Sequence, residues 1–432
     1  MQLLTFMGRN ARWLAGGFLL MFFSSFGQTF YIALSNGDIR REYDLSHGDF
    51  GLLYMVATLL SASTLPALGW LLDRYRAWMV AAATTVCLAA ATTVMATAAS
   101  LPLLFLALYF LRLFGQGMMT ETAMTATGRW FAANRGRAMA VNAMGLHVGT
   151  GLFPLIFVVA SATLGWRGTW FACAVALLVV ALPIVVWTTI RERDRQSEAG
   201  PKPKTAVRDW TMGEVVRSPT FYLVSAAVLA PPFIGTTLLF HQVYLTELRD
   251  WPMEVFASGF VLMAVTTGIF AFVCGALIDR FSAVRLLPFF LVPLAIACFV
   301  VAQFTAIESI FVFMVCLGIS QGFSSTLLGA LWPELYGTRY LGSVRSITVA
   351  MMVLASAVGP GITGQLIDWD VSYPLQIGVM GLYCIGVSVA MVFIARRLLS
   401  PELEEFDSAE AAAPAAGGRR TMDRLDPQPR EG

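Results

Sequence analysis

Charged residues are scarce in this sequence: Asp, Glu, Lys and Arg together make up 13% of its 432 residues, against roughly 25% in an ordinary soluble domain. Hydrophobic residues make up 57%, and the mean hydropathy is +0.70. A soluble chain could not cover so much apolar surface with so few polar side chains. The composition therefore excludes a water-soluble protein and indicates an integral membrane protein.

Disulfide frameworks and ligand clusters are also missing. The six cysteines lie inside apolar runs, without the spacing of a metal site or the loop positions of paired cysteines. The chain has no nucleotide-binding loop, no zinc-ligand pattern and no catalytic His-Asp cluster. We therefore expect no metal, no cofactor, no catalytic residue and no nucleic-acid partner, and the protein is not predicted to be an enzyme.

Twelve apolar runs are long enough to cross a hydrocarbon core of roughly 30 Å, which takes about 20 helical residues. They are apolar throughout rather than alternating, which predicts helices and not strands. The predicted fold class is an all-α integral membrane protein with twelve transmembrane helices, at residues 12–35, 50–72, 77–99, 101–125, 138–162, 168–190, 219–244, 255–278, 285–305, 308–332, 345–367 and 373–396.

The basic residues predict the orientation, since cytoplasmic loops are enriched in Lys and Arg. With both termini in the cytoplasm, 24 of the 29 basic residues fall on the cytoplasmic side. Arg112 lies inside a span, and only four basic residues fall outside: Arg40, Arg41, Arg167 and Arg249. Only two of the 29 are lysines, a bias typical of GC-rich bacteria, so we expect a multi-pass protein of the bacterial inner membrane.

One short charged turn occurs twice. Gly69-Trp70-Leu71-Leu72-Asp73-Arg74 lies between two apolar runs, and Gly275-Ala276-Leu277-Ile278-Asp279-Arg280 repeats it 206 residues later. Pro154 and Pro360 keep the same offset, which indicates two copies of one design. We predict two pseudo-symmetric six-helix bundles, residues 1–190 and 219–397, with a cytoplasmic linker at 191–218 and a disordered cytoplasmic tail at 398–432.

Two capping boxes are predicted near helix starts. Ser46 and Asp49 have the right spacing at the start of the second span, and Thr211 and Glu214 have it before a short interfacial helix. His47, beside the first box, is predicted to be a solvated loop histidine.

These features resemble the major facilitator superfamily of secondary transporters. The two repeated turns are similar to that superfamily's signature after its second span and to its echo after the eighth. Arg135-Gly136-Arg137-Ala138 is similar to a common loop after the fourth span. The resemblance covers about residues 12–396 and implies transport by alternating access. It is closer to the organic-anion and monocarboxylate-like branches than to the drug/proton antiporters.

The resemblance also implies a latch at the cytoplasmic boundary. There, aspartates meet a helix N-terminus or a loop arginine and hold that side shut, while glycines let helices approach closely. The alternative is that these charges set the topology alone. The predicted gating residues are Gly69, Asp73, Arg74, Arg129, Arg135, Gly275, Asp279 and Arg280.

Arg112 is the sharpest functional signal. It lies ten residues after Pro102, hence about 15 Å deep in the bilayer. A charge at that depth faces the bundle interior or a water-filled cavity. Its guanidinium can grip a carboxylate at two points, which predicts an anion site. The alternative is an internal ion pair, for example with Glu121.

His147 lies nine residues into the fifth span, among small residues. A titrating imidazole there can carry a coupling proton. A neutral histidine that bonds across helices is the alternative.

Polar residues at corresponding places of the two halves are further candidates for lining a central site. They are Gln28 and Tyr31 in the first span, His241 in the seventh, and Gln116 and Gln321 in the fourth and tenth. The alternative is hydrogen bonding between helices. We also expect Pro231 and Pro232 to break the seventh span.

The leading hypothesis is a monomeric secondary active transporter that moves a small organic anion, coupled to protons. The alternatives are a carrier of a neutral or aromatic solute, such as a vitamin or heterocycle, and a non-transporting sensor on the same fold.

Overall fold

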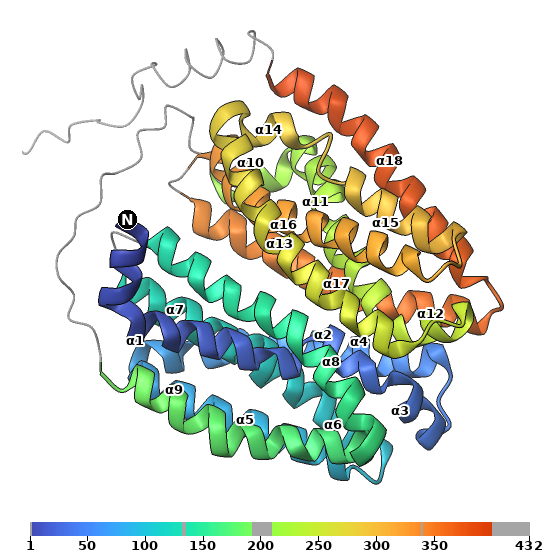
Figure 1. Ribbon diagram of the computed structural model, residues 1–432. Helices are drawn as coiled ribbons and strands as arrows, with labels where there is room; N and C mark the ends of the chain where they lie inside the picture. Colours follow the sequence, from blue (N-terminus) through green and yellow to red (C-terminus); the bar gives the residue numbers. More distant parts are fainter. Residues whose placement is uncertain (1, 132–134, 192–209, 338–339, 400–432) are drawn as a thin grey trace, which may run out of the picture.

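The computed structural model describes residues 2–131, 135–191, 210–337 and 340–399 (Figure 1). Helices and their connections make up all of these residues, with no strand among them. The first half contains α1 Gln2–Phe23, η1 Ser24–Gly27, α2 Thr29–Ile32, η2 Ala33–Ser35, α3 Asn36–Tyr43, α4 His47–Arg74, α5 Ala77–Thr97, α6 Leu101–Phe110, η3 Leu111–Met119, α7 Thr120–Trp130, α8 Arg135–Ala176, η4 Leu177–Ala181 and α9 Leu182–Thr189.

The second half contains α10 Met212–Arg217, α11 Pro219–Phe240, α12 Gln242–Arg249, α13 Met253–Phe281, α14 Ala283–Leu286, α15 Val292–Gln303, α16 Glu308–Tyr336, α17 Leu341–Asp368 and α18 Tyr373–Leu398. Most of the predicted linker and nearly all of the predicted tail, residues 192–209 and 400–432, lie outside the described residues.

Nine helices of the described chain are long and apolar enough to cross a membrane, or ten when the bent pair 10–27 and 29–43 counts as one span. This is fewer than the twelve predicted runs, for two local reasons. The runs at 138–162 and 168–190 are joined into one stretch, 136–189, across a kink at Gly165, which has φ 68°. The run at 285–305 is divided between α14 and the 12-residue α15. The chain is a multi-pass membrane protein.

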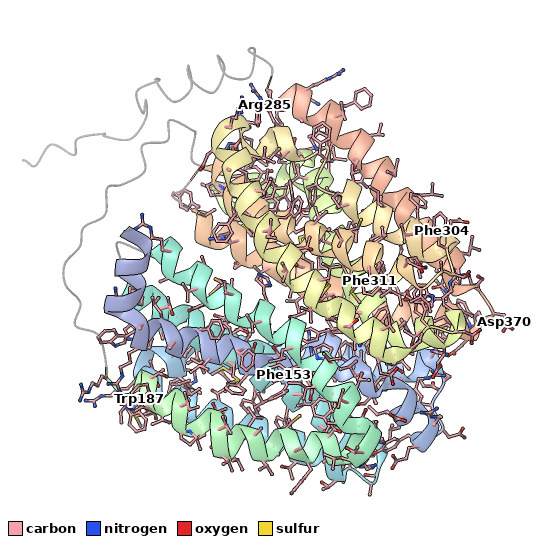
Figure 2. The ribbon with its side chains drawn as sticks, in the orientation of Figure 1. Phe153, Trp187, Arg285, Phe304, Phe311 and Asp370 are labelled. Atoms are coloured by element: carbon pink, nitrogen blue, oxygen red, sulfur yellow. The ribbon has the colours of Figure 1, made fainter. Side chains whose placement is uncertain are left out.

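Large apolar side chains cover the outside of the molecule, as expected for a surface in contact with lipid. Trp187 is 65% exposed and Phe304 is 59% exposed, and both project from the outer surface in Figure 2. Phe153 lies instead inside the first half, with ring centroids 4.6 Å from those of Phe22 and Phe26.

The helices of the first half lie together in the lower part of Figure 1, and those of the second half lie in the upper part. The two groups meet around α2, α4 and α12 and separate toward the N-terminus. We call the joined end the seam: residues 30–54 of the first half against residues 240–260 and 360–368 of the second. The side-chain hydrogen bonds identified between described residues of the two halves all lie there.

Asp368, at the end of α17, holds the seam by capping a helix of the other half. Its carboxylate accepts hydrogen bonds from Ser46 Oγ at 2.6 Å, from the His47 amide at 3.1 Å and from the Gly48 amide at 2.7 Å. These groups lie at the N-terminus of α4, where unpaired amides and the helix dipole favour a negative charge. A carboxylate of the second half thus caps a helix of the first half.

Glycine allows α4 and α17 to pack closely at the seam. A Cβ on Gly51 would lie 2.7 Å from the Pro360 carbonyl oxygen, and one on Gly364 would lie 2.3 Å from the His47 carbonyl oxygen. Both distances are shorter than any side chain tolerates. Small residues at helix crossings are the usual basis of packing in membranes.

Both predicted capping boxes are confirmed, at Ser46 with Asp49 and at Thr211 with Glu214, the second starting α10. The predicted break at Pro231 and Pro232 is wrong. Helix α11 runs through both prolines and ends at Phe240. Proline inside a membrane helix is tolerated because neighbouring groups satisfy the freed carbonyls.

Candidate functional site

A cavity of about 430 Å³ lies between the two halves. Its residues come from the broken first span, η3, α8, α11, α13, α16 and α17, so neither half forms it alone. Four of the predicted site residues line it: Gln28, Arg112, Gln116 and Gln321. The other lining residues are Thr29, Phe30, Leu146, Thr150, Pro231, Pro232, Gly235, Thr236, Leu239, Met263, Ser324, Ser325, Leu328, Val349, Met352, Val353 and Ser356.

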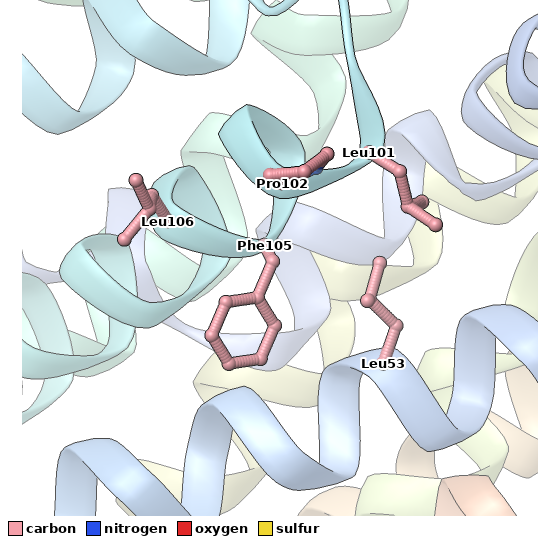
Figure 3. A pocket seen from close by; sticks show the side chains of 5 residues that line it. All are labelled: Leu53, Leu101, Pro102, Phe105 and Leu106. Atoms are coloured by element: carbon pink, nitrogen blue, oxygen red, sulfur yellow. The ribbon is translucent and has the colours of Figure 1, made fainter.

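A second hollow, of about 450 Å³, lies on the first half between α4 and α6 (Figure 3). Its lining is apolar throughout: Leu53, Leu101, Pro102, Phe105 and Leu106. It offers no group that could orient a polar ligand, whereas binding sites combine apolar walls with a few placed polar groups. The cavity between the halves is therefore the candidate site.

Arg112 is the only charged residue among the described residues that line this cavity, and it is 4% exposed. Its Nη1 donates to the Gly27 carbonyl oxygen at 3.3 Å and to Thr29 Oγ1 at 3.2 Å. The guanidinium carbon lies 5.5 Å from the centroid of the Tyr54 ring, a cation–π distance. Arg112 Nε is buried without a partner. The guanidinium is thus positioned by neutral groups and retains a free donor.

The first span provides these acceptors because its helix is interrupted. Gln28 has an extended backbone, with φ −83° and ψ 151°, between η1 and α2. The interruption leaves the Gly27 carbonyl without a helical partner, and Arg112 supplies one. Helix ends that line a cavity are where membrane proteins tolerate irregular backbone.

Arg112 and Gln116 lie on η3, a π-helical segment from Leu111 to Met119. Such segments are rare and often occur at functional sites. The segment packs very closely on the interrupted first span: a Cβ on Gly27 would lie 2.2 Å from the Leu111 carbonyl oxygen, and one on Gly115 would lie 2.5 Å from the Gly27 Cα. Two glycines therefore bring the guanidinium to the break in the first span.

Among the described residues, no carboxylate lies within ion-pair distance of Arg112. Glu121, the acidic partner considered from the sequence, is exposed on α7. A buried charge needs a partner or hydrogen bonds that compensate for lost hydration. Here a carbonyl, a hydroxyl and an aromatic ring provide that compensation, and an anion in the cavity would complete it.

Three predicted site residues lie outside the cavity lining. Tyr31 is buried within the first half, where its hydroxyl lies 2.9 Å from Cys173 Sγ. His241 is buried at the seam, with Nε2 3.1 Å from the Pro360 carbonyl oxygen. His147 is half-buried on α8, three residues from the lining residue Thr150.

The gating residues of the first repeat lie at the end opposite the seam. No described atom would lie within 4 Å of a Cβ on Gly69, so the predicted close helix approach there is absent in this structure. Arg74 is exposed, with its guanidinium 5.9 Å from the Trp70 ring centroid. Arg129 Nη1 donates to the Leu72 carbonyl oxygen near the end of α4. The side chains of Asp73 and Arg135 lie outside the described part of the structure.

The second repeat is exposed in the same way. Asp279 and Arg280 are exposed at the end of α13, and the nearest described neighbour of a Cβ on Gly275 is Thr326 Cγ2 at 3.9 Å. Glu334 lies beside this turn, where it accepts hydrogen bonds from the amides of Ala283 at 2.8 Å and Val284 at 3.4 Å.

Several lining residues were not predicted from the sequence. Thr150 and the serines at 324, 325 and 356 add hydroxyls to the cavity, but their sequence context matches that of hydroxyls that only bond their own helix. His47 differs from its prediction as a solvated loop residue. It starts α4 at the seam, with its ring centroid 4.2 Å from that of Tyr244. Within the described chain, no group of His, Cys, Asp and Glu is placed to hold a metal ion.

Comparisons with known proteins agree with this architecture. The profile of the Major Facilitator Superfamily matches residues 17–360 and 255–420. An oxalate:formate antiporter from Oxalobacter formigenes is 23% identical over 282 residues, which are 63% of this chain and 66%, just under two thirds, of that protein.

Two kinds of solved structure share the fold. A bacterial homologue of the human lysosomal transporter Spinster, in an inward-facing and unoccupied conformation, is 18% identical with a TM-score of 0.66, covering 94% of this chain and 99% of that one. The nucleoside transporter NupG is 13% identical with a TM-score of 0.65, covering 90% of this chain and 100% of that one. At these identities the two structures show the fold alone.

Proposed function

Because the chain belongs to the Major Facilitator Superfamily, as its sequence predicted, we propose that it is a secondary active transporter for a small organic anion that carries a carboxylate. Arg112 is the observation that carries this proposal. It is buried in the wall of the cavity between the halves, and no acidic side chain of the described chain pairs with it. The similarity to an oxalate:formate antiporter supports an anionic substrate.

The proposed architecture is twelve spans in two six-helix bundles, residues 1–190 and 219–397, in the bacterial inner membrane with both termini in the cytoplasm. The distribution of basic residues supports this orientation. In this orientation the seam lies on the external side of the membrane, and the repeated Asp-Arg turns lie on the cytoplasmic side. The structure would then be open toward the cytoplasm, as the exposed Asp279 and the uncrowded Gly69 suggest.

Transport would proceed by alternating access, in which the seam separates as the cytoplasmic ends close. We propose that the cytoplasmic ends are gated by the charged residues of the repeated turns and the following loop: Asp73, Arg74, Arg135, Asp279 and Arg280. The lining by both halves supports it, because a relative movement of the halves changes access to every lining residue.

A neutral or aromatic solute is the second candidate substrate. The wall contributed by α11, α13 and α17 favours it, since Leu239, Met263, Met352 and Val353 are apolar. Arg112 would then serve only to hold the interrupted first span through Gly27 and Thr29.

Uptake of labelled organic acids into proteoliposomes separates the two candidates, with melting temperature measured beside it. For an anion site, Arg112→Lys keeps the charge but loses the planar two-point grip, so uptake per folded molecule falls sharply. Arg112→Gln abolishes uptake and the discrimination between an acid and its amide. Normal acid uptake by well-folded Arg112→Gln would contradict the anion site and favour the neutral solute.

Proton coupling through His147 is tested in the same vesicles. His147→Gln should lose uptake driven by a pH gradient while exchange at equal pH survives. Retained gradient-driven accumulation would assign His147 a structural role.

A further inference from the structure

Two of the three histidines in the sequence face each other across the seam. The ring centroids of His47, on α4, and His241, between α11 and α12, are 6.1 Å apart. One belongs to each half, so any movement that separates the halves also separates this pair. His147 lies elsewhere, on α8.

His241 is completely buried and only half satisfied. Its Nε2 lies 3.1 Å from the Pro360 carbonyl oxygen, which can only accept, so this nitrogen carries the proton of the neutral ring. Its Nδ1 is buried and has no partner. A protonated ring would carry an N–H at Nδ1 without an acceptor, and an unpaired buried donor is costly. The closed seam therefore accommodates the neutral form.

His47, which is half-buried, shares one of these features from the other side of the seam. Its Nδ1 is also buried without a partner, and its ring lies against Tyr244. It is the first residue of α4, where the helix dipole disfavours a cation. When the seam separates, water can reach both rings and bond the imidazolium that the closed seam excludes.

The charged and titratable groups that face the pair come from every packed element. Arg40 of α3 and Asp368 of α17 act electrostatically on both rings, and Tyr373 of α18 contacts His241. Glu247 and Tyr244 of α12 act on Arg40. Asp368 is already occupied by its three bonds to the start of α4.

We propose that His47 and His241 form a proton-binding site that couples acidity to opening of the seam. The open state binds the proton more tightly than the closed state, so protonation shifts the population toward the open state. The assignment of the seam to the external side rests on the proposed function, whereas the coupling of protonation to opening does not. On that assignment, protons from outside favour the outward-open state, the direction that proton-driven uptake requires.

Pulsed EPR distances across the seam test this site without any substrate. Spin labels are attached at Arg41→Cys and Trp369→Cys, both exposed positions, one in each half, and a chain without the added cysteines gives the background. The long-distance population should rise between pH 8 and pH 5.5, by up to about tenfold per pH unit for each proton bound.

The double variant His47→Gln and His241→Gln should lose this response. If the double variant fails to fold, His47→Gln alone is used, since it leaves the buried His241 in place. This single variant should weaken the pH response. Identical distance distributions at both pH values in the native chain would overturn the proposal. A full response retained in a well-folded double variant would overturn it as well and assign the pH response to other groups. None of these outcomes depends on anion uptake, so this site and the proposed function can fail separately.

Discussion

The two halves contribute different chemistry to the walls of one cavity. The first half supplies the cation and mainly polar side chains, including Gln28, Arg112 and Gln116, whereas most side chains from the second half are apolar, such as Leu239 and Met263. Sequence landmarks repeat between the halves with an offset of 206 residues. The comparison indicates that a repeated scaffold can be retained while its cavity-facing positions diverge, so that a ligand meets a charged wall and a less polar, uncharged wall.

The two Asp-Arg turns also differ, in the charge of the side chain that bonds to the helix end beside each turn. Arg129 donates to a carbonyl near the C-terminal end of α4, whereas Glu334 accepts from the first amides of α14. A cation suits the negative end of a helix and a carboxylate suits the positive end. Opposite charges therefore stabilise opposite helix ends at comparable places in the two halves.

Asp368→Asn should give the largest effect among variants that test how one half holds the other. It removes the charge from three hydrogen bonds to the start of α4, which is worth about 1.5–3 kcal/mol. The closed seam should lose on the order of ten- to a hundredfold in population, at pH 8 as well as pH 5.5. The spin labels at positions 41 and 369 report this directly. Asp370→Asn, at an exposed neighbour, is the matched control.

Glu334→Ala should give an intermediate and local effect. It leaves the amides of Ala283 and Val284 unpaired, at a cost of about 1–2 kcal/mol. Amide hydrogen exchange at residues 283–287 should accelerate about five- to thirtyfold, with little change in the first half. Glu308→Ala, an exposed carboxylate at the start of α16, should leave this exchange unchanged. Equal acceleration in the control would show that Glu334 has no specific role.

The smallest effect concerns the two glutamines at comparable positions of the walls. Gln116 lies one helical turn from Arg112, and its Oε1 is buried without a partner; Gln321 lies on the less polar wall. Gln116→Leu should therefore raise KM for a carboxylate about two- to tenfold, or about 0.5–1.5 kcal/mol. Gln321→Leu should change it less. The reverse order would mean that the substrate is oriented by the second half.

Local signals in the sequence predicted local structure well. The capping boxes at Ser46 and Thr211 form because each box is complete within four residues. The burial of Arg112 followed from its depth in an apolar run. These features depend on few residues outside their own segment.

The predictions that failed, or were never made, depend on contacts between distant segments. The interruption at Gln28 and the π-helical segment beside it require Gly27 and Gly115 to meet, 88 positions apart in the chain. The pairing of His47 with His241 joins the two halves. Proline was a misleading signal at Pro231, since α11 continues there and ends nine residues later at Phe240.

The π-helical segment η3 could let Arg112 move without any bend in its helix. From Leu111 to Met119 each amide reaches one carbonyl further back than in an α-helix. Reassigning those amides by one position would rotate Arg112 and Gln116 about the helix axis while α6 and α7 remain helical. Such a rotation would withdraw the guanidinium from the Gly27 carbonyl without moving the ends of the helix. Anion-dependent changes in amide exchange confined to residues 111–119 would reveal it, and uniform exchange along residues 101–130 would argue against it.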